Sequence, residues 1–287
     1  MGGLLIPLKK TFVIGLLFWT TWSYGADGAL CLIFDQAKTC PLSDVQEFQQ
    51  TIQVAVVSQL SGTGTNFHSE DSASNVGLGL SASINEEFAY YALPLSYNFT
   101  DMFRFGVLVP YISGEDGKEG IGHVLAKFSL FHGGRALGAS LGLGAFVPSG
   151  SPEVSPPKEQ PDPHFDLMLR LSFGRTRLFW AASHTLRLPD STGLDLGDTS
   201  TAFLGWDSAY EGNLNYYIGV FTAQTEEDTL DGYAMKNQIS IVDVSGGIIF
   251  PGINFRLGAT GPLYTESTVI GAGDRKSSFD VGFKFEI

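Results

Sequence analysis

Apolar and polar residues alternate one by one along most of the chain, most clearly at its C-terminal end. In SFDVGFKFEI (278–287), every odd-numbered position is apolar and every even-numbered position is polar or glycine. Successive side chains of a β-strand point to opposite faces, so this period of two predicts a strand with one apolar face. Such a strand separates an apolar environment from a polar one.

The same period recurs upstream, in segments at 102–112, 121–132, 137–147, 164–173, 214–222 and 253–263. A soluble sandwich could bury such apolar faces in a core, but a membrane barrel requires the pattern to repeat around a closed sheet. Short turns near 132, 173, 211 and 251 alternate with longer polar loops that begin near 113, 151, 189, 225 and 265. Outer-membrane barrels have short periplasmic turns and long external loops, so we expect an all-β, transmembrane antiparallel β-barrel over residues 51–287.

The start of this region allows more than one strand count. Thirteen segments fit the pattern, beginning with 51–60, whereas bacterial single-chain barrels have an even number of strands. The alternation of short and long connections fails between 61 and 87. Either 75–85 is an extra hairpin arm in the first external loop, or this region holds one further strand. We predict twelve strands, with fourteen as the alternative.

The N-terminus predicts export. Lys9 and Lys10 precede a short apolar run at 11–19, and small residues follow it, so residues 1–26 are typical of a signal peptide cleaved after Gly25 or Ala26. The apolar run falls short of the roughly 20 residues that span a bilayer. Residues 27–50 are expected to form a short periplasmic extension.

Two cysteines, Cys31 and Cys40, lie in this extension, and they are the only cysteines of the chain. In an oxidising compartment a local disulfide between them is favoured. A metal site is the alternative, although no further ligands with suitable spacing lie nearby.

The charge content of the chain limits the classes of partner that it can bind. Only 16% of the residues are charged, compared with about a quarter in an average soluble domain, and the formal net charge is −13. No basic stripe is present to neutralise phosphates, so nucleic acid is excluded as a partner. The acidic residues fit exposed loops.

Two stretches resemble a known family: LPLSYNFTDMFRFGVLVPY (93–111) and LGLGAFVPSG (141–150). They resemble the outer-membrane family associated with the meta-pathway of phenol degradation, over about the central third of the chain. The resemblance implies a barrel channel for small, often aromatic, compounds. The C-terminal strand is the expected contact of the barrel-assembly machinery, although the chain ends in Ile287 rather than in the common Phe.

If the apolar faces meet lipid, the residues on the opposite faces line the lumen. The charged and histidine candidates are Arg104, His123, Lys127, Asp166, Arg170, Arg256, Asp280, Lys284 and Glu286. An interior of mixed sign could line a polar pore and set its selectivity. Alternatively, these groups pair with one another and fill a narrow barrel, since twelve strands lie near the border between a filled interior and a channel.

A hydrolase would need a nucleophile, a base and an orienting group within reach. Ser183 and His184 are adjacent, so on a strand they point to opposite faces, and His164 with Asp166 lacks an accessible serine. The five histidines show no metal spacing. We therefore predict no enzyme, no cofactor and no metal.

The tyrosines and tryptophans, and the Pro-rich loop, each allow two interpretations. Most tyrosines and tryptophans lie near strand ends and are expected in interfacial girdles, with a ring-stacking track as the alternative. They are Tyr90, Tyr91, Tyr97, Tyr111, Trp180, Trp206, Tyr210, Tyr216 and Tyr264. The Pro-rich loop at 148–163 is predicted to be exposed, with an inward constriction as the alternative.

These observations predict a porin-like protein in the outer membrane of a Gram-negative-type bacterium, embedded in its lipid bilayer. The predicted function is a passive channel for small, hydrophobic or aromatic molecules. The alternatives are a non-transporting structural or adhesion barrel that acts through its acidic loops, and a secreted soluble sandwich.

Overall fold

The computed structural model describes residues 76–286, except for gaps at 85–87, 101, 115–116, 134–135, 153, 156–157, 190, 192–193, 196, 209–213, 231–232, 235–237, 251–252, 254 and 268–276. The signal peptide, the extension with Cys31 and Cys40, and the candidate strand at 51–60 lie outside the described residues. The cleavage site, the disulfide and the domain boundaries therefore stay predictions.

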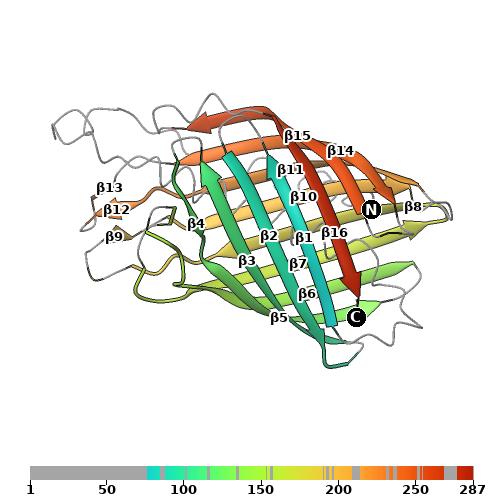
Figure 1. Ribbon diagram of the computed structural model, residues 1–287, viewed down its shortest axis with the longest axis horizontal. Helices are drawn as coiled ribbons and strands as arrows, with labels where there is room; N and C mark the ends of the chain where they lie inside the picture. The colour runs from blue at the N-terminus through green and yellow to red at the C-terminus, as the bar shows by residue number, and fades with distance from the viewer. Residues whose placement is uncertain are drawn as a thin grey trace, which may run out of the picture. The chain divides into compact units, whose positions relative to one another are not determined.

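Twelve antiparallel strands form a closed barrel (Figure 1). The main sheet has thirteen strands, of which β4 is a short addition to the edge of β3. The barrel closes because β1 pairs with β16 on one side and with β2 on the other. The twelve wall strands are β1 (Val76–Ile84), β2 (Phe88–Asn98), β3 (Phe103–Gly114), β5 (Val124–Gly133), β6 (Leu137–Val147), β7 (Asp162–Phe173), β8 (Thr176–Thr185), β10 (Thr199–Ser208), β11 (Asn215–Thr225), β14 (Ile239–Phe250), β15 (Phe255–Ser267) and β16 (Ser278–Glu286). The predicted fold and the count of twelve are confirmed.

The first strand resolves the uncertainty near residue 75. The sequence allows a hairpin arm in an external loop at 75–85, but Val76–Ile84 of this segment form β1 and lie in the barrel wall. Leu80 lies opposite Phe283 of β16, and Ser83 lies opposite Asp280. The hairpin-arm reading is wrong because this segment closes the sheet and thereby satisfies the backbone groups of the last strand. In a bilayer those groups would otherwise lack partners.

Outward side chains of the wall are apolar and exposed, whereas inward ones are small, polar or packed. On β6, Leu141 and Leu143 are 47% and 51% exposed, while Ser140 on the other face is 6% exposed. Exposed apolar area is unfavourable in water by roughly 25 cal/mol per Å², so this surface requires a hydrocarbon environment. The fold and the apolar outer wall place the chain in an outer membrane.

Among the girdle candidates that the structure describes, all but Tyr90 lie on the outer wall, and Tyr210 lies outside the described residues. Tyr97, Trp206 and Tyr216 are exposed there, as predicted. Tyr90, however, is 1% exposed and packs in a cluster inside the barrel, so its assignment to a girdle is wrong. Tyr90 and Tyr91 are adjacent, and the strand period allows only one of them to face lipid.

The long loops carry four further short strands. β4 (Glu119–Ile121) pairs with β3, and β9 (Leu194–Asp195), β12 (Thr229–Leu230) and β13 (Tyr233–Ala234) form a separate three-stranded sheet. β9 belongs to the connection between β8 and β10, and the other two belong to the connection between β11 and β14. This small sheet therefore joins two long loops (Figure 1). No helix in the described part of the chain is long and apolar enough to cross a membrane.

Candidate functional site inside the barrel

An ion pair lies on the inner wall in front of β6. Lys127 of β5 and Asp166 of β7 approach to 2.9 Å between Nζ and Oδ2, although β6 separates their strands. The inward positions of β6 between them are Gly142 and Gly144. A Cβ on Gly142 would overlap the Asp166 carboxylate, and one on Gly144 would overlap Lys127. The two glycines therefore leave the space in which the pair forms.

A cavity of about 120 Å³ adjoins this ion pair. Its charged lining consists of Arg104, Lys127 and Asp166, and Leu108, Leu125, Phe131 and Met168 are among its apolar lining residues. In this measure a single water molecule needs about 10–15 Å³, so the space admits several waters or one small ring. The cavity thus offers an apolar surface with charged groups at its border.

Arg104 is held at the short-turn end of this cavity. Its Nε donates to Oδ1 of Asn98 at 2.7 Å, and Asn98 is its cross-strand neighbour on β2. Its guanidinium lies 4.7 Å from the centroid of the Phe131 ring, a cation–π contact. The short connection between β2 and β3 sets this register, so the turn places the charge.

A second ion pair, Arg177 with Asp207, was not predicted from the sequence. Nε and Nη2 of Arg177 donate to the two oxygens of Asp207 at 2.7 Å each, a bidentate geometry. The residues are cross-strand partners on β8 and β10. The one-by-one alternation does not reveal the inward face of β8 and β10, because the inward residues Phe179 and Phe203 make both faces of these strands apolar. The sequence holds no direct signal for this pair, because the long connection between β8 and β10 leaves their register open.

The interior also contains two buried apolar clusters, which makes it less polar than the alternation predicts. One consists of Met168, Phe179, Ala181, Phe203, Phe221, Ala223, Ile239 and Ile241. The other consists of Tyr90, Ala92, Leu108, Ile112, Leu125, Phe146 and Val154. Cβ atoms added at Gly205 or Gly219 would overlap the Phe203 ring, so that ring lies flat against the inner wall.

The loop after β6 packs against the second cluster. Val154 and Ser155 are each 1% exposed, and Val154 is part of that cluster. The backbone N–H of Gly150 donates to Nδ1 of His123 at 3.2 Å, and that of Ser151 donates to the Ile121 carbonyl at 2.7 Å. The prediction of an exposed loop is therefore wrong for Val154 and Ser155. An apolar side chain in a polar loop gains more by covering Leu125 and Phe146 than by facing water.

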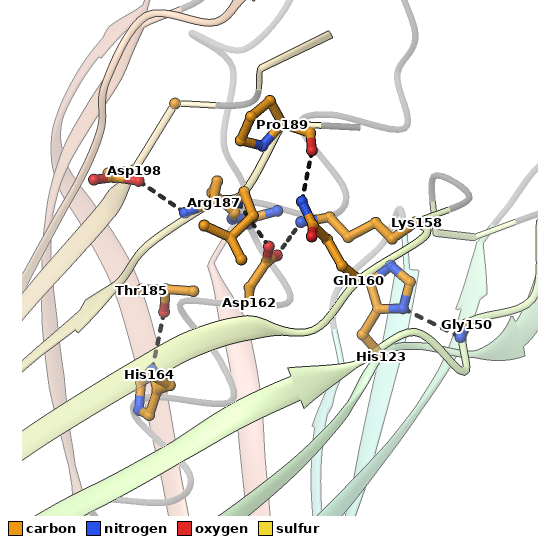
Figure 2. A network of polar contacts seen from close by, with 12 residues as sticks. His123, Gly150, Lys158, Gln160, Asp162, His164, Thr185, Arg187, Pro189 and Asp198 are labelled. Carbon is orange, nitrogen blue, oxygen red and sulfur yellow. Dashed lines mark hydrogen bonds and ion pairs between the residues drawn. The ribbon is translucent and has the colours of Figure 1, made fainter. Parts of the chain in front are cut away.

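Asp162 fastens this loop to the next long connection. Its Oδ1 accepts the backbone N–H of Leu188 at 3.0 Å, and its Oδ2 pairs with Lys158 (Figure 2). Gln160 donates from Nε2 to the carbonyl of Pro189 at 2.7 Å. Asp162 is only 2% exposed, so these partners offset the cost of burying its charge. The two loops are thereby tied together above the wall strands.

The predicted lumen residues fall into several environments. Arg104, Lys127 and Asp166 line the cavity, and His123 contacts the inward loop, as described above. Arg170 is 2% exposed, the Arg256 guanidinium lies 5.9 Å from the Tyr217 ring centroid, and Asp280 accepts from Oγ1 of Thr260 at 2.7 Å. The side chains of Lys284 and Glu286 lie outside the described set. Within the described chain no group of His, Cys, Asp and Glu is placed to hold a metal.

The comparisons with known proteins define a class. The sequence matches no family model, and no curated protein matches it. Among solved structures, the COG4313 outer membrane channel from Pseudomonas putida F1 has a TM-score of 0.58 at 13% identity, over 74% of this chain and 94% of that one. The KdgM porin has a TM-score of 0.42 at 12% identity, over 74% and 99%. LpxR from Salmonella typhimurium has a TM-score of 0.42 at 8% identity, over 74% and 100%.

At 13% identity, the similarity to the Pseudomonas putida channel shows a shared fold and no more. The similarity to the Pseudomonas putida channel, together with the closed sheet, defines the chain as an outer-membrane β-barrel. The predicted fold and location are confirmed. The association with phenol degradation stays a prediction.

Proposed function

We propose that the chain is a passive outer-membrane channel for small molecules. The observation that carries this proposal is the cavity inside the closed wall, bordered by Arg104 and by the Lys127–Asp166 pair. Paired opposite charges on a pore wall interact with polar solutes without fixing one sign of charge. The fold shared with an outer membrane channel supports the same conclusion.

The solute class follows from the rest of the lining. Leu108, Leu125, Phe131 and Met168 give the cavity an apolar surface, and its volume suits a single small ring. We therefore infer small hydrophobic or aromatic solutes, in agreement with the sequence resemblance. We infer that the loop around Val154, which belongs to the same buried cluster as Leu125 and Phe146, narrows the path from the long-loop side.

Reconstitution into planar bilayers tests the channel. We expect discrete conductance steps, and we expect Gly142→Leu to reduce them because leucine would fill the space occupied by the ion pair. Ala139→Leu is the matched control, since it adds the same side chain to the same strand on the lipid side. Heat-modifiable electrophoretic mobility would verify that both variants fold.

Liposome swelling tests the solute class. Because phenol and benzyl alcohol also cross lipid without a protein, each swelling rate is compared with that of protein-free liposomes, and the increase should be larger for these two solutes than for a small sugar. Equal increases would contradict the apolar preference while leaving the channel intact.

A second candidate is a non-transporting structural barrel. The two buried apolar clusters favour it, because they fill part of the interior with close-packed side chains. Absence of both conductance steps and solute-dependent swelling would select this candidate.

We also infer that β16 is the strand delivered to the barrel-assembly machinery, because it forms the closing contact with β1. Crosslinking of that machinery to β16, and not to the central strand β8, would test this.

A further inference from the structure

A serine, a histidine and an aspartate converge on the outer wall at the long-loop end of the barrel. His184 of β8 and Ser200 of β10 are cross-strand partners, and their Nδ1 and Oγ atoms lie 2.9 Å apart. On the other side of the imidazole, Nε2 lies 3.6 Å from Oδ2 of Asp198. One imidazole therefore stands between a hydroxyl and a carboxylate.

Asp198 is fixed by a separate contact. Its Oδ1 accepts the backbone N–H of Arg187 at 2.7 Å, which leaves Oδ2 facing the imidazole (Figure 2). The side chains of His184 and Asp198 are 41% and 27% exposed, and Ser200 is exposed. The three groups are thus both oriented and accessible.

We propose that Ser200, His184 and Asp198 form a catalytic triad for hydrolysis of carboxylic esters. A nucleophile within about 2.6–3.2 Å of a base that is oriented by a third group is the general signature of such sites. A neutral imidazole has one acceptor nitrogen and one donor nitrogen, so Nδ1 can take the serine proton while Nε2–H faces Asp198. The Nε2–Oδ2 distance exceeds a hydrogen bond, and catalytic contacts are often this long before substrate binds.

A similar arrangement inside the barrel lacks access. Oγ1 of Thr185 lies 2.9 Å from Nδ1 of His164, and Nε2 of His164 lies 3.9 Å from Oδ2 of Asp166. His164 and Thr185 are only 3% and 2% exposed, and the Asp166 carboxylate pairs with Lys127. An ester could not reach this inner group, whereas it could reach Ser200.

The position of the triad selects the substrate class. On the same outward face, the next residues of the two strands are Ala182 and Ala202, followed on β10 by Leu204, which is 52% exposed. The hydroxyl therefore lies at the polar rim of an apolar wall, on the side of the long, external loops. This is where the ester group of an outer-leaflet lipid is found, with its acyl chain along the wall. The substrate is an acyl ester of a membrane lipid.

The reaction balances with water as the second reactant. Oγ of Ser200 attacks the ester carbonyl carbon while its proton passes to Nδ1 of His184, and Asp198 stabilises the imidazolium. Collapse of the tetrahedral intermediate breaks the bond to the lipid alcohol, which takes that proton. Water then hydrolyses the acyl-serine and releases a fatty acid. Gln224, the cross-strand partner of Ser200 on β11, offers an amide donor for the oxyanion.

The test uses the full-length barrel reconstituted into phosphatidylethanolamine vesicles. We expect mass spectrometry to detect lysolipid and free fatty acid, and a fluorophosphonate probe to add its mass to Ser200. Ser200→Ala should abolish labelling and lower turnover by about 10³-fold or more, and Asp198→Asn should lower turnover by up to about 10⁴-fold. Ser240→Ala, two strands along the same outward row, should keep full activity.

Three outcomes would overturn the proposal. Folded wild-type protein that yields no lysolipid and takes up no probe would exclude the triad. Lysolipid production that survives in Ser200→Ala would assign it to a contaminant. Turnover of soluble p-nitrophenyl butyrate without lysolipid would exclude a lipid substrate. None of these outcomes depends on conductance, so the channel is tested separately.

Discussion

The Lys127–Asp166 pair makes a measurable contribution to stability, and a double-mutant cycle can isolate it. The two side chains are 21% and 13% exposed, so they are largely shielded from bulk water. At an effective dielectric constant of about 20 and a separation of 2.9 Å, their attraction is roughly 6 kcal/mol. Desolvation of the two charges offsets several kcal/mol of this. This desolvation cost keeps the net contribution of the pair small. The cycle subtracts the cost that each charge carries by itself, so we expect it to report most of the attraction, a coupling of about 5 kcal/mol.

The cycle consists of Lys127→Met, Asp166→Leu and the double variant. Each single change leaves one charge without its partner, and we expect a loss of about 3 kcal/mol in the free energy of unfolding, the low end for a buried pair. The double variant should recover most of this loss. Guanidinium unfolding in lipid vesicles, followed by tryptophan fluorescence, provides the measurement.

Two results would refute this reasoning. A coupling below about 0.5 kcal/mol would mean that the pair behaves like an exposed surface pair. Single variants as stable as the wild type would mean that water fills the cavity and solvates the remaining charge. Conductance of the same variants would then show whether the freed charge alters ion selectivity.

Three further predictions concern the wall and the loop. Phe203→Ala should lower the free energy of unfolding by about 3–5 kcal/mol because the ring is buried inside the barrel. Phe128 faces lipid and is 59% exposed, so Phe128→Ala should lower the free energy of unfolding clearly less in the same assay. Leu141→Arg should destabilise the reconstituted barrel by about 2–4 kcal/mol if this position lies near the bilayer midplane, and refolding yields in thick and thin bilayers would check it. Val154→Asp places a charge in the buried cluster and should release the loop after β6. Larger conductance steps and new protease cleavage near residue 154 would show the release. Unchanged conductance and cleavage would contradict the assigned packing.

The wall was predictable from sequence because its physics is local. Each residue of 137–147 faces either lipid or interior, and its chemistry reports which. The segment 75–85 was ambiguous for a different reason: its inward residues are glycine and serine, and only its pairing with the last strand shows that it belongs to the wall.

The site was less predictable because its contacts depend on register between distant segments. Lys127 and Asp166 are 39 residues apart and meet across a third strand. Along the chain His184 is adjacent to Ser183, whereas its partner in the folded protein is Ser200 on the next strand. The packing of Val154 also depends on apolar residues of β2, β3 and β5, and not only on β6, which directly precedes the loop.

The pairing of Gly77 with Glu286 has a consequence for biogenesis. The first and last strands of the wall meet only after almost the entire chain has been delivered, so the seam forms late and the loop-closure entropy opposes it. Until then, both edges expose rows of unpaired N–H and C=O groups, which are templates for aggregation. A nonsense mutation that removes only the last strand would leave this sheet permanently open. We expect quality-control proteases to degrade such a chain before it inserts into the membrane.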